Sequence, residues 1–262
     1  MIFNRKPHIQ KKTPEQFEIM ARAGKVVADT LSLIEQTTTV GTTLLQIDAC
    51  AREQLRLQGA TSSFLGYHGY PAVVCTSVNE QVVHGIPSDY ALRTGDIVSV
   101  DFGAVVEGWH GDSAITMLIG DVSDEARALS IVTNRAMWAG INASVAGNTL
   151  GDVGHAIQSV IEAENRWGLI EDYSGHGIGT EMHMEPFVPN FGDPGEGLVL
   201  EVGMAIAIEP MVTAGTHLTN TLSDNWTVVT IDDSIASHWE HTIAITAEGP
   251  RVLTLRAGEQ PL

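Results

Sequence analysis

Cysteine and basic residues are scarce in this sequence, and each shortage excludes a class of protein. Two cysteines, Cys50 and Cys75, cannot build a disulfide framework or a zinc finger in a chain of 262 residues. The 14 Lys and Arg residues stand against 32 Asp and Glu residues, for a formal net charge of −18. Because binding of a phosphate backbone needs clustered positive charge, we expect no direct contact with nucleic acid.

Long apolar segments are scarce as well. No apolar run approaches the roughly 18 residues of a membrane-spanning helix, and no charged segment followed by an apolar one opens the chain as in a signal peptide. We therefore expect a cytoplasmic protein without membrane contact. The densest basic group lies in residues 1–12, an N-terminal arm that we expect to be solvated: Arg5, Lys6, Lys11 and Lys12. Residues 13–262 show no compositional boundary and are expected to form a single domain.

Apolar spacing and capping residues predict the main elements. Thr13, Pro14 and Gln16 form a typical helix start. Helices are predicted over residues 13–36, 43–57, 124–145 and 150–167, and strands over 97–106 and 109–118, with short apolar runs at 72–75 and around 82. After residue 168 the chain returns to strands and loops. This order predicts an α+β fold in which helices cover an antiparallel sheet.

One pattern recurs in the two halves of the chain. A glycine precedes an acidic residue by six positions, across apolar sequence, at Gly95 before Asp101 and again at Gly203 before Glu209. We interpret the two halves as duplicated units that each contribute carboxylates to a shared site.

Asp101 lies in a strand that otherwise requires burial, although carboxylates are rarely buried unless they are paired or bind metal. If residues 107–108 form a hairpin turn, Asp101 pairs with Ala114. Gly103 then pairs with Asp112, and the two carboxylates share one face, with Cα atoms on the order of 7–8 Å apart. Two carboxylates that converge there repel each other unless a cation lies between them.

Glu209 and Glu240 repeat this anomaly in the second half, each beside apolar strand sequence. One such acid is more simply explained as a strand-end residue that reaches water or an arginine. Four of them, in a chain with so few basic residues, favour a metal site. Carboxylates suit hard or borderline divalent ions such as Mn, Fe(II) and Co. So many carboxylates would overcharge a site for one ion, which favours two bridged ions.

Histidines offer further ligands. His176 lies between glycines that let the backbone approach a ligand closely, and His183 follows seven residues later. His84 is a third candidate, and His110, which shares a strand face with Asp112, is not excluded. For the remaining histidines we expect surface or capping roles: His8, His68, His155, His217, His238 and His241.

Seven segments, in order and compatibly spaced, resemble the motif set of the type I methionine aminopeptidases, which belong to metallopeptidase family M24. The segments are Tyr67–Pro71, Ser77–Pro87, Val100–Gly103, His110–Asp112, Gly175–Gly179, Ile208–Val212 and Glu240–Ile243. The similarity extends from about residue 13 to residue 253. It implies the pita-bread fold, in which two α+β halves are related by pseudo-twofold symmetry, and it makes residues 13–262 one catalytic domain.

The resemblance also implies roles for individual residues. The residues that match metal ligands are Asp101, Asp112, His176, Glu209 and Glu240. Glu209 matches a ligand that also accepts a proton, and His84 and His183 match histidines that contact the substrate. The residues that match the lining of a pocket for the methionine side chain are Tyr67, Tyr70, Cys75, His84 and Trp226. A polarisable thioether packs well against aromatic edges and a thiol.

Two pocket positions depart from the family pattern. Phe64 stands where bacterial relatives often carry cysteine, and Met182 stands where many carry phenylalanine. Both residues are expected to contact the substrate, so the pocket should differ in shape and in its tolerance of methionine analogues.

The implied function is removal of the initiator methionine from nascent proteins, through attack on the first peptide bond by water that two divalent ions activate. The ions are Co, Mn, Fe(II) or Zn. The resemblance further implies a monomer that acts on chains as they leave the ribosome.

Two alternatives compete with this interpretation. An Xaa-Pro aminopeptidase or prolidase has the same fold, but such enzymes usually carry a separate N-terminal domain, and here about 12 residues precede the first helix. A non-catalytic interaction protein on this fold would be expected to lose metal ligands, and all five are present.

Overall fold

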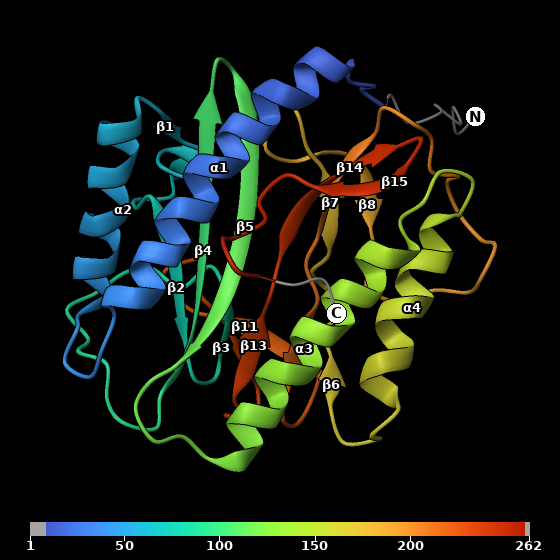
Figure 1. Ribbon diagram of the computed structural model, residues 1–262. Helices are drawn as coiled ribbons and strands as arrows, with labels where there is room; N and C mark the ends of the chain where they lie inside the picture. Colours follow the sequence, from blue (N-terminus) through green and yellow to red (C-terminus); the bar gives the residue numbers. More distant parts are fainter. Residues whose placement is uncertain (1–8, 260–262) are drawn as a thin grey trace.

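The computed structural model describes residues 9–259 and has the predicted α+β arrangement, with α1 and α2 at one side of the strands and α3 and α4 at the other (Figure 1). The α-helices of this part are α1 Pro14–Thr37, α2 Leu44–Gln58, α3 Asp124–Ala143 and α4 Leu150–Glu162. Each begins after a Ser or Thr whose side chain accepts a backbone N–H three residues on: Thr13, Thr43, Ser123 and Thr149. Within residues 9–259, no helix is long and apolar enough to cross a membrane.

Two larger sheets are paired antiparallel throughout, and α1 and α2 pack against the first of them. The first contains β1 Thr61–Ser62, β2 Val74–Val78, β4 Ile97–Val106 and β5 Trp109–Leu118. The second has the order β15 Gly249–Val252, β14 His241–Thr246, β9 Ala205–Ile208, β7 Gly175–Gly177 and β8 Met184–Val188. Two small sheets complete the strands of the described residues. One has the order β13 Ala236–His238, β10 Met211–Thr213 and β6 Gly168–Leu169. The other has the order β11 Thr219–Thr221, β12 Val228–Thr230 and β3 Gln81–Val83. A 3-10 turn, η1, spans Tyr67–Gly69.

The pattern that recurs in the sequence corresponds to a repeated structural unit. Gly95 has φ of 98° and donates its N–H to Ile119, and Gly203 has φ of 97° and donates its N–H to Ile245. Each glycine therefore turns the chain into the first strand of a hairpin-like pair, β4 with β5 and β9 with β14. The two halves thus have the duplicated architecture that the sequence indicated.

One helix is shorter than predicted. α4 ends at Glu162, five residues before the predicted end at Trp167. Asn165 adopts a left-handed conformation with φ of 47° and donates its N–H to the carbonyl oxygen of Glu162. Asparagine tolerates this conformation, so the chain turns there and enters β6.

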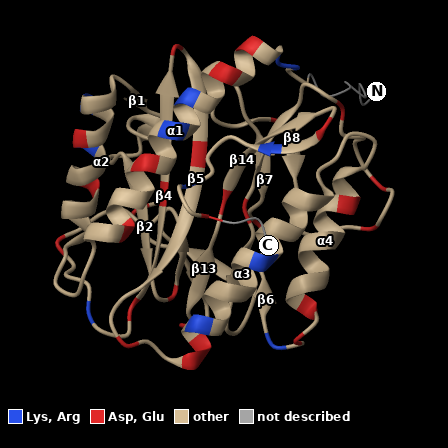
Figure 2. Cartoon of the chain, in the orientation of Figure 1, with Lys and Arg blue, Asp and Glu red and all other residues tan. Residues whose placement is uncertain are grey.

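The described part of the N-terminal arm is not a solvated tail. Lys12 is only 7% exposed, its backbone N–H donates to Gly203, and its ammonium donates to the carbonyl oxygen of Gln10. The end of its side chain lies against Gly179, where an added Cβ would be 2.8 Å from Cε of Lys12. Arg5 and Lys6 lie outside the described residues. Elsewhere, acidic side chains are spread over helices and loops and basic ones are sparse (Figure 2).

Helix α1 crosses β5 at a contact made by two glycines. A Cβ on Gly24 would lie 2.1 Å from the carbonyl oxygen of Leu253, and a Cβ on Gly111 would lie 2.8 Å from the backbone nitrogen of Gly24. Close-packed interiors do not tolerate such distances. The absence of a side chain on Gly111 therefore lets α1 lie directly against the strand that carries Asp112, and its absence on Gly24 lets the chain at Leu253 approach the helix.

Replacement of Gly24 by Ala should lower the free energy of unfolding by about 1–3 kcal/mol, because the new methyl group overlaps Leu253 by more than a gain in helix propensity offsets. Urea unfolding of the metal-free protein measures this change. Lys25→Ala, at the neighbouring exposed helix position, is the control and should change stability by less than about 0.5 kcal/mol. Equal stability of Gly24→Ala and the wild type would contradict the close contact.

Candidate active site

The β4–β5 hairpin has the predicted register. Gly103 pairs with Asp112 and Asp101 pairs with Ala114. The turn is formed by Glu107 and Gly108, with φ of 50° and 79°, which matches the right-handed twist of the two strands. The first-half carboxylates therefore lie on one face of this hairpin.

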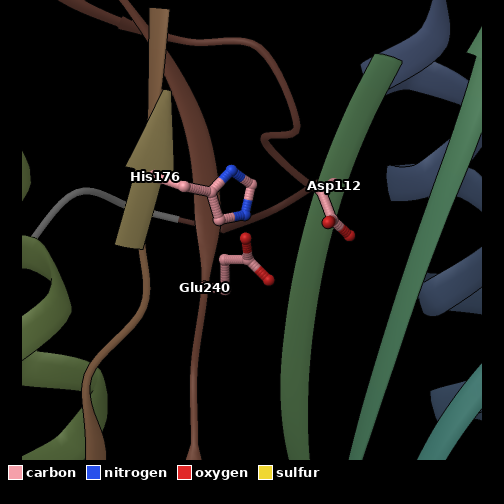
Figure 3. A group of neighbouring side chains, drawn as sticks. All are labelled: Asp112, His176 and Glu240. Atoms are coloured by element: carbon pink, nitrogen blue, oxygen red, sulfur yellow. The ribbon is translucent and has the colours of Figure 1, made fainter. Parts of the chain in front are cut away.

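The second-half carboxylates come from the ends of two neighbouring strands. Glu209 directly follows β9 and Glu240 directly precedes β14. Glu240 exchanges backbone hydrogen bonds of 3.1 and 3.3 Å with Ala114 in β5, so the two halves of the protein meet here. His176, in β7, points toward Glu240, and Asp112 approaches from the opposite side (Figure 3). One ligand atom from each of these three side chains lies within 4.8 Å of the others.

The tautomer of His176 suits a metal ligand. Its Nδ1 lies 2.9 Å from the carbonyl oxygen of Gly177, which can only accept a hydrogen bond, so Nδ1 carries the proton. The Nε2 atom therefore presents a lone pair and lies 3.4 Å from Oε1 of Glu209. A backbone carbonyl that holds the other ring nitrogen is a common arrangement around metal-binding histidines.

The carboxylates are buried close to one another. Burial and the neighbouring carboxylates raise the pKa of Asp101, Glu209 and Glu240 well above the ordinary range. Burial also raises the pKa of Asp112 to about 7. One oxygen each of Asp101, Asp112 and Glu240 is buried without a hydrogen-bond partner among the described residues. Such oxygens, with a free imidazole nitrogen beside them, fit divalent cations.

All thirteen site residues predicted from the sequence line one cavity of about 280 Å³, together with His68. Asp101, Asp112, His176, Glu209 and Glu240 line part of its wall. The other predicted residues supply a mostly apolar wall: Phe64, Tyr67, Tyr70, Cys75, His84, Met182, His183 and Trp226. Edge-on ring contacts join Tyr70 to both Phe64 and Trp226. The cavity therefore combines a carboxylate-rich wall with an aromatic one.

Two histidines stand between these walls. The Nδ1 atom of His183 lies 2.8 Å from the hydroxyl of Tyr67. His84 adopts φ of 61°, a strained conformation for a non-glycine residue and one that clusters at functional sites. Burial lowers the pKa of His183 and lowers that of His84 to about 4, so both rings are neutral at neutral pH.

A second cavity, of about 570 Å³, meets the first at the carboxylates. Both cavities are lined by His84, Asp101, His176, His183 and Glu209. The second cavity continues past Tyr173 to the exposed ring of Phe187. The sequence did not indicate it, because its wall is assembled from short strands and loops that are far apart in the chain.

Several residues differ from the sequence-based expectation. His110 lines neither cavity in the described structure, and its Nδ1 lies 2.9 Å from the hydroxyl of Ser63. His238 and His241 were expected at the surface or in caps, yet both are buried. His238 lies beside the carboxylates, with Nε2 3.6 Å from Oε2 of Glu209. An imidazole can satisfy hydrogen bonds in an interior, which sequence position alone does not reveal.

The sequence also did not predict the hydroxyl groups that form hydrogen bonds between the two halves of the protein. The Thr242 hydroxyl donates to the backbone carbonyl of Asp112 and accepts its N–H, and the Ser113 hydroxyl donates to the carbonyl of Glu240. Thr116 contacts the backbone of His238 in the same way. The sequence shows these residues only as small hydroxyl side chains in otherwise apolar strands. Such residues are common in sheets, so they do not identify a contact between the halves.

Comparison with known proteins places this site in a family. Metallopeptidase family M24 matches residues 18–247. Methionine aminopeptidase 1 of Mycobacterium tuberculosis is 50% identical over 253 residues, which cover 94% of this chain and 95% of that protein. Methionine aminopeptidase 1 of Bacillus subtilis is 43% identical over 243 residues, which cover 93% and 98%.

Solved structures agree. The methionine aminopeptidase of Thermotoga maritima has 42% identity and a TM-score of 0.92, covering 94% of this chain and 99% of that one. A prolidase from Pyrococcus furiosus shares the fold, with a TM-score of 0.76 and 22% identity, but this chain covers only 66% of it. The chain therefore belongs to metallopeptidase family M24 and, within it, to the type I methionine aminopeptidases.

Proposed function

We propose that this protein is a metal-dependent aminopeptidase that removes the N-terminal methionine of other proteins. The observation that carries the proposal is the junction of a small, largely aromatic cavity with a cluster of buried carboxylates and one imidazole. The names of its close relatives support the same activity.

Two divalent ions are proposed as cofactors, with Asp101, Asp112, His176, Glu209 and Glu240 as ligands. The unpartnered carboxylate oxygens support this assignment. When bound, the ions would polarise the scissile carbonyl group and lower the pKa of water at the site. The metal in the cell is proposed to be Co, Mn, Fe(II) or Zn.

The protein's own groups handle the protons. Glu209 lies where the two cavities meet, so its carboxylate is placed to take up a proton during hydrolysis. When the Tyr67 hydroxyl donates to Nδ1 of His183, the Nε2–H of that ring is left to donate to the developing oxyanion. His84, neutral and also in both cavities, is proposed to assist the departing amine.

The substrate side chain is proposed to occupy the smaller cavity. Tyr67, Tyr70, Cys75 and Trp226 offer aromatic edges and a thiol to the methionine thioether. Phe64 and Met182 complete the lining. The rest of the substrate chain would leave through the second cavity, since the scissile bond must lie beside Glu209, where the cavities meet.

The test of this function is methionine release from Met-Ala-Ser, beside an Xaa-Pro peptide, by metal-stripped protein reconstituted separately with Mn, Co, Fe(II) and Zn. We expect metal-dependent release from Met-Ala-Ser only. Cleavage of the Xaa-Pro peptide alone would instead indicate a prolidase activity. No cleavage of either peptide by folded, metal-loaded protein would leave the non-catalytic interpretation as the better one.

The biological setting is a proposal from the same family membership. We propose a single catalytic domain, residues 13–262, which acts as a cytoplasmic monomer on nascent chains at the ribosome. Light scattering measures the oligomeric state, and co-sedimentation with translating ribosomes measures the association.

Filling the smaller cavity should weaken substrate use. Replacement of Cys75 by Leu adds bulk to a wall of the 280 Å³ cavity, and we expect kcat/KM for Met-Ala-Ser to fall by about 10–200-fold, the scale of small volume changes in apolar pockets. Binding of Mn(II), measured by calorimetry, should stay unchanged. Cys50→Leu, in a helix outside both cavities, is the control. Unchanged kcat/KM in Cys75→Leu would exclude this cavity as the methionine pocket.

A further inference from the structure

We propose that Glu259, held by Arg256, is a positioning residue for the metal centre and acts through His241. The inference rests on the proposed metal ligands Asp112 and Glu240. It concerns the C-terminal segment beyond residue 247, which the family match does not include.

The first step joins the C-terminal segment to β14. Arg256 donates from Nη2 to Oε1 of Glu259 at 2.5 Å, and its backbone N–H donates to Oε2 at 3.2 Å. The same Oε1 lies 3.1 Å from Nε2 of His241, the residue that follows Glu240. Because a carboxylate only accepts hydrogen bonds, Nε2 of His241 carries a proton and donates it to Glu259.

The second step joins His241 to both halves of the site. Nδ1 of His241 lies 2.9 Å from the Thr254 hydroxyl, within hydrogen-bond distance. The Thr254 oxygen in turn accepts the backbone N–H of Thr242 at 3.1 Å. The Thr242 hydroxyl bonds both the N–H and the carbonyl oxygen of Asp112, at 3.0 and 2.8 Å. A continuous chain of hydrogen bonds thus extends from Glu259 to the backbone of a proposed ligand.

Burial makes this chain rigid. His241, Thr242 and Thr254 have no exposed surface, and Arg256 is 7% exposed. Nη1 of Arg256 has no partner among the described residues, but the links from Glu259 through His241 to Asp112 are all made. In such surroundings, loss of one member leaves the others unpaired at a cost. Groups that orient metal ligands from outside the coordination shell typically change metal affinity by 10–100-fold when they are replaced.

Glu259, Arg256 and His241 lie outside the proposed substrate site, so they can position the ligands but cannot take part in the reaction. None of the described residues Glu259, Arg256 and His241 lines either cavity at the carboxylates. Glu259 and Arg256 instead face a separate cavity of about 620 Å³ beside Trp138 and Trp239. They cannot touch the substrate, so any effect on the reaction must pass through the position of the ligands.

The test is Glu259→Gln in the full chain. One carboxylate oxygen becomes an NH2 group, which faces either the backbone N–H of Arg256 or the Nη2 and Nε2 donors of Arg256 and His241, so at least one donor loses its acceptor and the charge that pairs with Arg256 is lost. We expect the dissociation constant for Mn(II), measured by calorimetry, to rise by about 10–100-fold. With Mn(II) in excess, kcat for Met-Ala-Ser should fall while KM changes little. The control is Glu18→Gln, which removes another carboxylate paired to an arginine, the exposed Glu18–Arg251 pair, and should change neither quantity.

A second variant keeps the test decisive if Glu259→Gln does not fold. Thr254→Val keeps the shape of the side chain and removes the hydroxyl between His241 and Thr242. It should weaken Mn(II) binding in the same direction. Wild-type affinity for Mn(II) in whichever of these variants folds would overturn the proposal. Because metal affinity is measured without turnover, weakened binding in a protein that does not cleave Met-Ala-Ser would support the positioning role and reject the peptidase function.

Discussion

Glu209→Gln should leave a folded, metal-binding protein whose turnover of Met-Ala-Ser is lowered by at least about 10²–10⁴-fold, the scale of a lost general acid or base. Glutamine has nearly the shape of glutamate but cannot take up a proton at neutral pH. Glu209 directly follows β9 and, with Asp101, lines both cavities where they meet, so its carboxylate is placed beside the bond that is cleaved. Steady-state kinetics at saturating metal measure the loss.

The matched control for this variant is Glu201→Gln. Glu201 lies upstream of the same strand, is exposed and pairs with Lys11 at the surface. Its replacement should leave kcat within about twofold, because surface ion pairs contribute little. A near-normal rate of turnover by Glu209→Gln would contradict the role of Glu209 as the proton acceptor.

Asp112→Asn should change stability in opposite directions with and without metal. In the metal-free protein several buried carboxylates repel one another, and removal of one charge should raise the free energy of unfolding by on the order of 1–3 kcal/mol at neutral pH. The wild type should gain about 2.7 kcal/mol from Mn(II) at a hundredfold excess over its Kd. The variant should lose most of this gain, because a neutral amide replaces a charged ligand.

Thermal unfolding with Mn(II) and with a chelator measures both effects. Asp29→Asn is the control, since Asp29 is an exposed acid paired with Lys25 on α1, away from the cavities. It should change stability little under either condition. Retention of the full Mn(II) stabilisation by Asp112→Asn would contradict its role as a ligand, and a less stable metal-free variant would contradict the repulsion.

Much of the fold could be predicted from the sequence because its signals are local. The hairpin turn at Glu107 and Gly108 lies between two strands of ten residues, so turn chemistry and alternation together fix the register. Capping residues set the helix starts within one turn. α4 was predicted too long because apolar periodicity does not record the single left-handed residue, Asn165, that ends the segment.

The candidate site was recognised from the sequence because its carboxylates are chemically out of place in buried strands, and because the surrounding motifs resemble a known family. These two signals identify which residues belong to one site, but they do not give the positions of these residues in space. In the structure, ligand atoms of Asp112, His176 and Glu240 come within 4.8 Å of one another, although these residues lie in three separate segments of the chain.

The sequence by itself determined the helices, the hairpin and the set of residues that gather at the carboxylates. Only the tertiary structure decided how the two halves join, that His241 is interior rather than surface, and that Glu259 of the C-terminal segment reaches His241, the residue after Glu240. The Thr242 hydroxyl meets Asp112 across 130 positions of sequence. No local pattern encodes such a contact, because it depends on burial of both strands in one core, where each polar group must find a partner.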